Sequence, residues 1–589
     1  MDCMRMIARL VALAVLTVAS QMWAHAALNI FPLKDLRAGM RGVGKTVFQG
    51  DKVEDFQVEI LGVLENTGPR QSIILGKLSG GPLQHTGVMQ GMSGSPVYID
   101  GRLVGAVALA FPFAKDPIAG IRPIEEMLSV GEGGGVAPKA FRTAIGGDLA
   151  GVFPARPATL SGDMRMTEVA TPLSLSGFTA NAVEQFASRM KALGLEPRQG
   201  ISMGGAPSGA MGDPSKLQPG SMISVELMTG DLSVGADGTL TAIDEGKVYA
   251  FGHRFLAIGP TELPFTRSEV ITLLANTNTS FKISSARELM GVISQDRNTA
   301  VAGFLGKRAA TVPLEINVTE ARGAKQSYKM QMVNDRFLSP FLLQMAVFSA
   351  IDATERSLGS SSIALKGTIE FENRAEPARI ANIYAADGGS AMQAAINTAV
   401  PLSYIMQGGF DALKVKRIAI ELTSFEEKRD LTVGAVYLSK KEVKPGDTVE
   451  LLASLEGSNG REISRGVKYT IPPGTAPGIL FFTVADGAQT SLAELRQVLA
   501  QAPHSAEQLV ATVNRLKASD KAYVRVWRAE PAYEVQGEEM PDPPPSVALI
   551  LGAGQNFSQN RNSKVGEMTI DTGGLMVTGS KTVQVEVKE

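Results

Sequence analysis

The chain has 589 residues, of which 44% are hydrophobic and 20% are charged, and its formal net charge is −2. This length is enough for several domains with their own cores. The near-neutral charge and the lack of a basic run interleaved with aromatics argue against recruitment by nucleic acid or an anionic membrane. With 62 glycines and only 6% aromatic residues, the composition favours many short strands and turns over a helical bundle.

The first 26 residues are typical of a secretory signal peptide. Arg5 and Arg9 precede an apolar run that ends shortly before Ala24-His25-Ala26, a small-x-small cleavage site. The alternative is an N-terminal membrane anchor, for which the apolar run is short. The only cysteine, Cys3, lies in this segment, so the cleaved chain would have no disulfide and no thiol catalysis. We expect an exported protein, periplasmic or extracellular, with no stable membrane span after cleavage.

Residues 27–135 alternate apolar and polar side chains and predict a β-rich unit. Its clearest hairpin is "PVYIDGRLVGAVALA", in which an Asp-Gly pair favours a two-residue type I′ turn. Directly before it, "GMSGS" places Ser93 in a glycine-rich bend. A serine becomes a nucleophile when a base takes its proton and donors hold the oxyanion, and the amides of Gly91 and Ser93 are the natural donors. The alternative is a small residue in an ordinary turn. Pro96 and the hairpin exclude the lipase-type elbow, which needs a helix after the serine.

Candidate bases are few. The chain beyond the expected cleavage site contains His85, His253 and His504, and no two are close enough in sequence to indicate a metal site. His253 follows an apolar strand in "YAFGHRF", whereas His85 lies eight residues before Ser93 on the approach to the same bend. Chain order does not decide between them, because the same triad geometry occurs in several orders. A lone histidine is also often structural. No metal and no cofactor is expected.

The rest of the chain predicts further β structure with a few helices. "ANAVEQFASRMKALGLEP" and "FLLQMAVFSAIDATERSL" have helical spacing, and capping boxes at Ser491 with Glu494 and at Ser505 with Gln508 predict two short helices. The sequence thus predicts seven parts: a signal peptide at 1–26, a serine-bearing barrel half at 27–135, a mixed connector at 136–220, a histidine-bearing barrel half at 221–325, a helix plus sandwich-like domain at 326–430, an Ig-like domain at 431–487, and short helices with a terminal β segment at 488–589.

Three of these stretches resemble one known family. "GVMQGMSGSPVYIDGRLVGAVA" resembles the SpoIVB-type (sporulation stage IV protein B) serine peptidases, which carry a GMSGSP motif followed by a strand, an x-Gly turn and a "GAV" strand. "GTLTAIDEGKVYAFGHRF" is similar to the family's strand pair ending in Gly-His, and "SQDRNTAVAGFLG" to its later "SDR…G…G" segment. The resemblance implies a serine endopeptidase with Ser93 as nucleophile and His253 as general base.

The order of the blocks differs from that of the family, in which the Gly-His block comes first. Since Ser93 precedes His253 here, the simplest interpretation is a circular permutation. We therefore expect a mainly β fold: a permuted chymotrypsin-like double β-barrel, followed by C-terminal β-sandwich-like domains with a few helices. Those C-terminal domains are candidates for docking a protein partner.

The sequence departs from the family pattern at the acidic residue of the expected site. The family's Asp-Pro upstream of the serine is absent from "GKLSGGPLQHTG". Asp296, in "SQDRN", is the candidate that would orient His253; alternatively it pairs with Arg297 or caps a turn. The resulting prediction is an exported serine endopeptidase that cleaves protein substrates. The alternative is a catalytically inactive secreted scaffold or a protein- or glycan-binding protein built on the same barrels.

Overall fold

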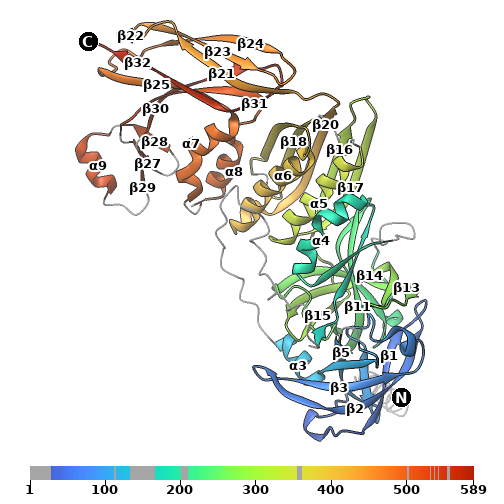
Figure 1. Cartoon of the computed structure of the whole chain (residues 1–589). Helices are drawn as coiled ribbons and strands as arrows, with labels where there is room; N and C mark the ends of the chain where they lie inside the picture. The colour runs from blue at the N-terminus through green and yellow to red at the C-terminus, as the bar shows by residue number, and fades with distance from the viewer. Residues whose placement is uncertain are drawn as a thin grey trace, which may run out of the picture.

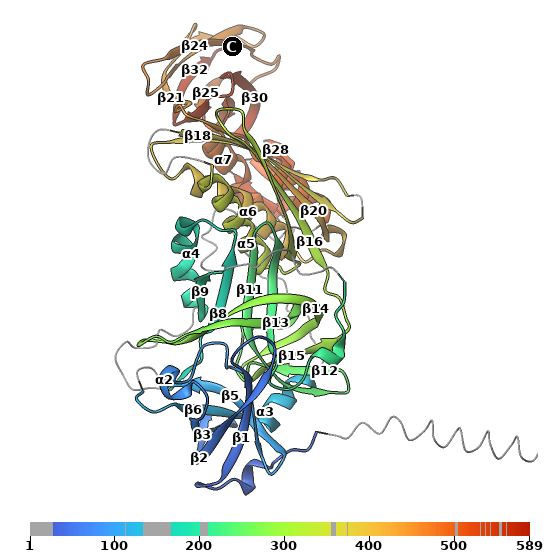
Figure 2. The same ribbon diagram turned by 90° about the vertical axis from the view of Figure 1, so that its right-hand side faces the viewer.

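The computed structural model describes residues 28–111, 114–132, 166–200, 210–354, 361–373, 375–500, 503, 505–530, 532–535, 538–541, 543–552, 557–560 and 562–589. The expected signal peptide, Cys3 and His504 lie outside these residues. The molecule is elongated, with the N-terminal barrel at one end, a large sheet in the middle and a sandwich at the C-terminal end (Figures 1 and 2). Among the described residues, no helix is both long and apolar enough to cross a membrane.

The N-terminal unit is a closed barrel of six antiparallel strands. Its ring order is β1-β2-β3-β6-β5-β4, and β4 returns to β1. In β2, Phe56, Val58 and Ile60 are buried at every second position and fill the barrel. The predicted Asp-Gly turn is confirmed, since Asp100 and Gly101 have φ of 49° and 72° between β4 and β5. The elements of this unit are η1 (Leu33–Asp35), β1 (Arg41–Val47), β2 (Val53–Gly68), β3 (Gln71–Ser79), α2 (Leu83–Thr86), β4 (Pro96–Ile99), β5 (Arg102–Ala110), β6 (Ile118–Pro123), α3 (Ile124–Leu128) and η2 (Ser129–Glu132).

A second barrel-like unit is the core of a 13-stranded sheet. Its strands pair in the order β10-β13-β14-β15-β12-β11, and β11 pairs again with β10. They are β10 (Met222–Gly230), β11 (Ser233–Asp244), β12 (Lys247–Ala250), β13 (Gly259–Leu274), β14 (Phe281–Arg297) and β15 (Ala300–Leu305). The segment between the barrels contributes β7 (Thr167–Glu168), β8 (Thr171–Ser176), α4 (Ala180–Ala192), β9 (Leu195–Gln199) and η4 (Pro214–Lys216). Of these strands, β8 and β9 extend the sheet beyond β11, so much of the expected connector belongs to it.

The same sheet continues past residue 325, the domain boundary expected from the sequence. β17 spans that position and pairs with both β16 and β10, while β16 pairs in parallel with the distant β20. The apolar helices α5 and α6 pack against each other on this extension. Its elements are β16 (Thr311–Thr319), β17 (Lys325–Val333), α5 (Leu338–Asp352), β18 (Ser361–Phe371), β19 (Ala378–Ala386), α6 (Ser390–Gln407), η5 (Asp411–Leu413) and β20 (Val415–Phe425).

The C-terminal part is a sandwich of a four-stranded and a five-stranded sheet around one apolar core. The helix expected at Ser505 is confirmed, since its hydroxyl accepts from the Gln508 amide. The start expected at Ser491 is wrong: α7 begins at Gly487, because the Asp486 carboxylate already accepts from the Gln489 amide. The elements are β21 (Asp430–Leu438), β22 (Glu442–Val443), β23 (Thr448–Glu456), β24 (Glu462–Thr470), β25 (Gly478–Ala485), α7 (Gly487–Ala500), α8 (Ala506–Asn514), β26 (Lys521–Arg528), β27 (Ala532–Val535), β28 (Glu538–Pro541), α9 (Pro545–Gly552), β29 (Phe557–Asn560), β30 (Ser563–Asp571), β31 (Met576–Thr578) and β32 (Ser580–Val587).

The fold class expected from the sequence is confirmed. The structure is mainly β, with a closed six-stranded antiparallel barrel beside a second barrel-like unit and further β domains, as in a chymotrypsin-like double barrel. The permuted origin of this arrangement stays a prediction.

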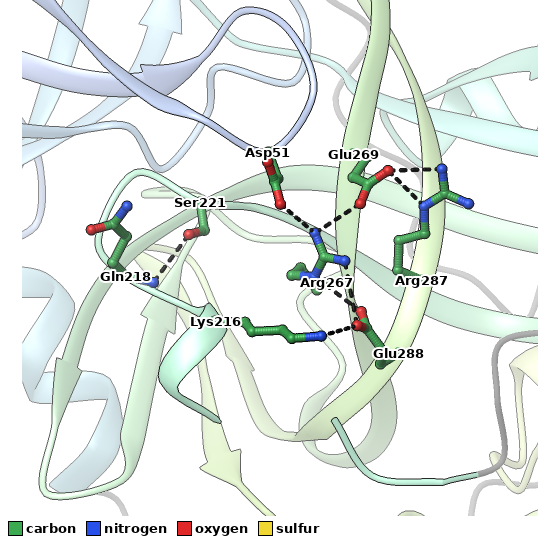
Figure 3. Close-up of polar contacts among 8 residues, drawn as sticks. All are labelled: Asp51, Lys216, Gln218, Ser221, Arg267, Glu269, Arg287 and Glu288. Carbon is green, nitrogen blue, oxygen red and sulfur yellow. Dashed lines mark hydrogen bonds and ion pairs between the residues drawn. The ribbon is translucent and has the colours of Figure 1, made fainter. Parts of the chain in front are cut away.

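An ion-pair network joins the two barrels on one side (Figure 3). Arg267 on β13 lies 3.1 Å from Asp51 in the β1–β2 turn and 2.9 Å from Glu288 on β14. The hydrogen bond from Arg267 lowers the pKa of Glu288 to about 2. Beside the network, Gly50 and Val270 exchange two backbone hydrogen bonds of 2.7 Å across the barrels. These contacts fix the relative placement of the two barrels and so of the residues between them.

Candidate active site

Ser93 lies on a tight turn that leads directly into β4. The Ser95 amide donates to the Met92 carbonyl at 2.9 Å, which closes the turn around Ser93. On the β5 side, the Gly94 amide donates to the Val107 carbonyl and the Val107 amide donates to the Ser95 carbonyl. The turn is therefore held on the same edge of β5 that carries β4.

The other side of this turn docks on β11 of the second barrel. The Thr239 amide donates to the Ser93 carbonyl at 2.8 Å, and the Thr239 hydroxyl donates to the Gly91 carbonyl at 2.8 Å. The Thr241 hydroxyl donates to the Gly94 carbonyl at 2.7 Å. Three hydrogen bonds to carbonyls of the turn hold it in place, so a serine of the first barrel is positioned by the second.

Hydrogen-bonding groups on the turn remain unused. Within the described part of the chain, neither the Gly91 amide nor the Ser93 amide has a hydrogen-bond acceptor. The Ser93 hydroxyl is fully buried and has no hydrogen-bond partner there either. Buried polar groups without partners are rare in folded proteins and call for an explanation. Two free amides and one free hydroxyl on one turn are the groups that an oxyanion hole and its nucleophile require.

His253 follows β12 on a strained backbone. Phe251 and Gly252 have φ of 70° and 69°, and the left-handed region is costly for a bulky residue such as phenylalanine. The imidazole is buried, and its Nδ1 lies 2.7 Å from the Arg254 carbonyl oxygen. Because a carbonyl only accepts, Nδ1 carries the proton in this contact, and the neutral ring then keeps its lone pair on Nε2. This is the tautomer that a general base needs.

The structure brings the Ser93 and His253 segments to one place. A Cβ on Gly94 would lie 2.6 Å from the Phe251 amide nitrogen, and a Cβ on Gly252 would lie 3.4 Å from the Val107 carbonyl oxygen, the acceptor of the Gly94 amide. Both glycines therefore adjoin the same point of β5, one residue away from Ser93 and His253. The hydrogen bond expected between a catalytic serine and its base is not formed in this structure, because the Ser93 hydroxyl has no hydrogen-bond partner among the described residues. The role of His253 as the base of Ser93 stays a prediction.

Asp296 lies on β14 and supports the loop after His253. Its carboxylate accepts hydrogen bonds from the Phe255, Leu256 and Ile258 amides at 2.8, 2.7 and 3.3 Å. Burial raises the pKa of Asp296 to about 6, although these amides act to lower it. These bonds agree with the alternative in which Asp296 caps a turn. An orienting effect of Asp296 on His253 through this loop stays a prediction.

We expect Asp296→Asn to reduce stability and to alter its pH dependence. The asparagine NH2 group would face an amide donor, at a cost of about 1–3 kcal/mol in the free energy of unfolding. Because the folded-state pKa of Asp296 is raised from 3.8 to about 6, its contribution is full below pH 3.8 and is lost as the pH rises through 6. Thermal unfolding between pH 4 and pH 7 should therefore vary less in the variant than in the parent chain. A variant with unchanged stability and an unchanged pH profile would contradict this role.

Gly94 lies where the two barrels approach each other closely. A Cβ there would lie 2.0 Å from the Thr239 carbonyl oxygen, and φ is +94°. We expect Gly94→Ala to destabilise the chain by about 3 kcal/mol or more, since it combines backbone strain with a backbone clash. Gly101→Ala is the matched control, because Gly101 has φ of +72° and nothing within 4 Å of a built Cβ. Equal melting temperatures of the two variants would contradict the docking contact.

His85, the other candidate base, lies elsewhere. It is exposed on the short helix α2 and lines a groove of about 280 Å³. Glu168 and Asn278 line the same groove. The geometry therefore favours His253 as the base and leaves His85 at the rim of a depression near the turn.

Sequence reasoning missed two groups beside the site. Lys282 is buried, its stem lies beside Gly91, and its amine donates to the Thr46 hydroxyl, which also accepts from Ser95. Burial lowers the pKa of Lys282 to about 7, against the opposing effect of Asp237. The second group is Arg254, which forms an ion pair with Glu168. No local sequence motif marks either residue as part of the site. The one signal that could have pointed to Arg254 is its position next to Gly252-His253.

A nucleophile candidate on a turn of one barrel, docked close to the histidine-bearing segment of the next, is an arrangement compatible with a serine peptidase. Residues 17–128 match the family model described as SpoIVB peptidase S55, so the recognition of that family from the GMSGSP segment is confirmed. The match supports a serine peptidase at the level of the family; it includes Ser93 and ends before His253 and Asp296. A search of curated proteins and a search of solved structures found no match.

Proposed function

We propose that this protein is an exported serine endopeptidase in which Ser93 is the nucleophile and His253 the general base. The observation that carries the proposal is the Ser93 turn. Among the described residues, its hydroxyl and two of its amides have no hydrogen-bond partner, and the turn docks on β11, which pairs with the strand that leads to His253. The Nδ1 contact of His253 with the Arg254 carbonyl supports the same assignment, because it leaves Nε2 as the basic nitrogen.

The reaction follows from these groups. Nε2 of His253 takes the Ser93 hydroxyl proton while Oγ bonds to the carbonyl carbon of the scissile peptide, and the amides of Gly91 and Ser93 hold the resulting oxyanion. The oxyanion then collapses, the C–N bond breaks, and the imidazolium gives its proton to the leaving amine. Water hydrolyses the acyl-enzyme by the same steps. Asp296 acts as a positioning residue through the loop that it caps.

Labelling with a fluorophosphonate tests this function. The probe should form an adduct on the peptide that contains Ser93, located by mass spectrometry, and the adduct should be absent from Ser93→Ala. An adduct on another serine, or none under any condition, would contradict the proposal. Export is tested separately, by fractionating cells that express the full chain and sequencing the N-terminus of the exported product.

The competing function is an inactive binding scaffold. The complete burial of Ser93 and His253 favours it, because a substrate cannot reach a fully enclosed hydroxyl. In that case the C-terminal sandwich would be the docking surface for a protein partner. The same labelling experiment separates the two functions, provided that whatever encloses Ser93 can be displaced.

A further inference from the structure

One edge of β5 carries three segments in succession. Its opposite edge pairs with β6, from Gly105 to Ala110. On the first edge, β4 pairs up to Ala106, and the Ser93 turn then bonds to Val107. Beyond the turn, β7 pairs with Leu109 and Ala110. The strand that anchors the candidate nucleophile therefore continues directly into an edge that a segment of the same chain occupies.

The segment on that edge, residues 166–170, comes from the chain between the two barrels and is held by backbone and side-chain contacts. The Val169 amide donates to the Ala108 carbonyl at 2.9 Å, and Val169 is buried. Glu168 lies 3.4 Å from Arg254, the residue after His253. Met166 packs against Ile73, Ala108 and Leu109. Backbone, charge and apolar contacts thus all fix an extended strand at this place.

The direction of this strand matches that of a substrate. β7 is antiparallel to β5. Because β5 runs away from the Ser93 turn, residues 166–170 run toward it and present their carboxyl side to it. A peptide cleaved by Ser93 must run in the same direction, because the carbonyl that Ser93 attacks lies at the carboxyl end of the part that becomes the acyl group. Extended peptides commonly bind by adding a strand to an exposed sheet edge, where main-chain hydrogen bonds give affinity and side-chain contacts give specificity.

We propose that residues 166–170 are a built-in pseudosubstrate strand that occupies the peptide-binding edge of β5 and keeps Ser93 enclosed. This inference rests on the proposed function. A protein substrate enters by displacing the strand and adding antiparallel to Ala108–Ala110. The preferred peptide then carries an acidic residue opposite Arg254 and, two residues earlier, an apolar residue at the Met166 position. The groove of about 280 Å³ along Thr167–Ala170 gives the incoming chain access to this edge.

Two variants release the strand by different means. Val169→Pro removes the amide that bonds to Ala108, and the extended conformation of the residue before it is compatible with proline. Glu168→Lys places a like charge opposite Arg254. Glu196→Lys is the matched control, because Glu196 lies in the same inter-barrel segment and its own ion pair, with Lys191, lies on α4 and β9. Thermal unfolding of each variant shows whether it remains folded.

The probe is a fluorescein-labelled peptide, Met-Arg-Met-Thr-Glu-Val-Ala, which copies residues 164–170. Its binding is measured by fluorescence anisotropy with the full chain, and this measurement needs no catalysis. We expect binding at least about tenfold tighter for Val169→Pro and Glu168→Lys than for the parent chain or Glu196→Lys, since a resident competitor reduces apparent affinity by its occupancy. A peptide with lysine in place of glutamate should bind Val169→Pro at least about fivefold more weakly, because it meets Arg254 with the wrong charge.

The outcomes separate the two proposals. If both variants stay folded and bind the peptide no more tightly than the parent chain, the pseudosubstrate strand is overturned. Tighter binding together with faster fluorophosphonate labelling of Ser93 supports both the strand and the peptidase. Tighter binding without an adduct on Ser93 keeps the peptide-binding edge and overturns the catalytic function.

Discussion

Replacing Ser93 by alanine is expected to lower peptide hydrolysis by about 10³-fold or more, because the acyl-enzyme cannot form without the hydroxyl. Its stability should not fall. The Ser93 hydroxyl is buried without a partner among the described residues, and removing an unsatisfied buried polar group is neutral or stabilising by up to about 1 kcal/mol. The measurements are turnover of the full chain on an unfolded protein substrate and thermal unfolding of the same preparation.

Ser95→Ala is the matched control for this variant. Ser95 lies two positions further along, is equally buried, and donates its hydroxyl hydrogen to Thr46 at 3.1 Å. Its loss should cost about 1 kcal/mol of stability and leave hydrolysis within a few-fold of the parent rate. The two serines should thus show opposite patterns, one in rate and the other in stability. Full activity in Ser93→Ala, or equal losses of hydrolysis in both variants, would exclude Ser93 from the mechanism.

The parts of the fold that could be predicted from the sequence depend on local chemistry. The Asp-Gly pair at 100–101 requires positive φ at both positions and has it. Ser505 caps α8 through an amide three residues away. The GMSGS turn was recognisable because its glycines permit the conformation that Ser93 needs. Each of these signals acts within a few residues, so sequence reasoning finds it without tertiary context.

The parts that could not be predicted depend on pairings between distant segments. β16 and β20 pair in parallel although about 100 residues separate them along the chain, a separation that no local propensity encodes. The same holds for Lys282 beside Gly91 and for Val169 on Ala108. The motif around Asp296 points to this residue, but its bonds to the amides of residues 255–258 depend on how β14 lies beside that loop. The hydrogen-bond partners of such a carboxylate are therefore set by how the strands and loops pack in the folded barrels.

His253→Asn is expected to lower hydrolysis by about 10³-fold or more while retaining the local backbone. The asparagine NH2 group can take over the donor role of Nδ1 toward the Arg254 carbonyl, whereas nothing replaces Nε2. The variant therefore removes the base and keeps the contact that orders the loop. We expect a melting temperature closer to that of the parent chain than that of His253→Ala, which also leaves a cavity beside Phe251.

His85→Asn makes the same chemical change at an exposed histidine on the rim of the groove, and it should leave the rate of hydrolysis unchanged. Fluorophosphonate labelling gives a second readout, since the rate of adduct formation on Ser93 depends on the same base as hydrolysis does. Labelling should slow in His253→Asn and stay at the parent rate in His85→Asn. If instead His85→Asn abolishes both reactions and His253→Asn spares them, then the base is His85, and the contact of the two barrels beside His253 serves stability alone.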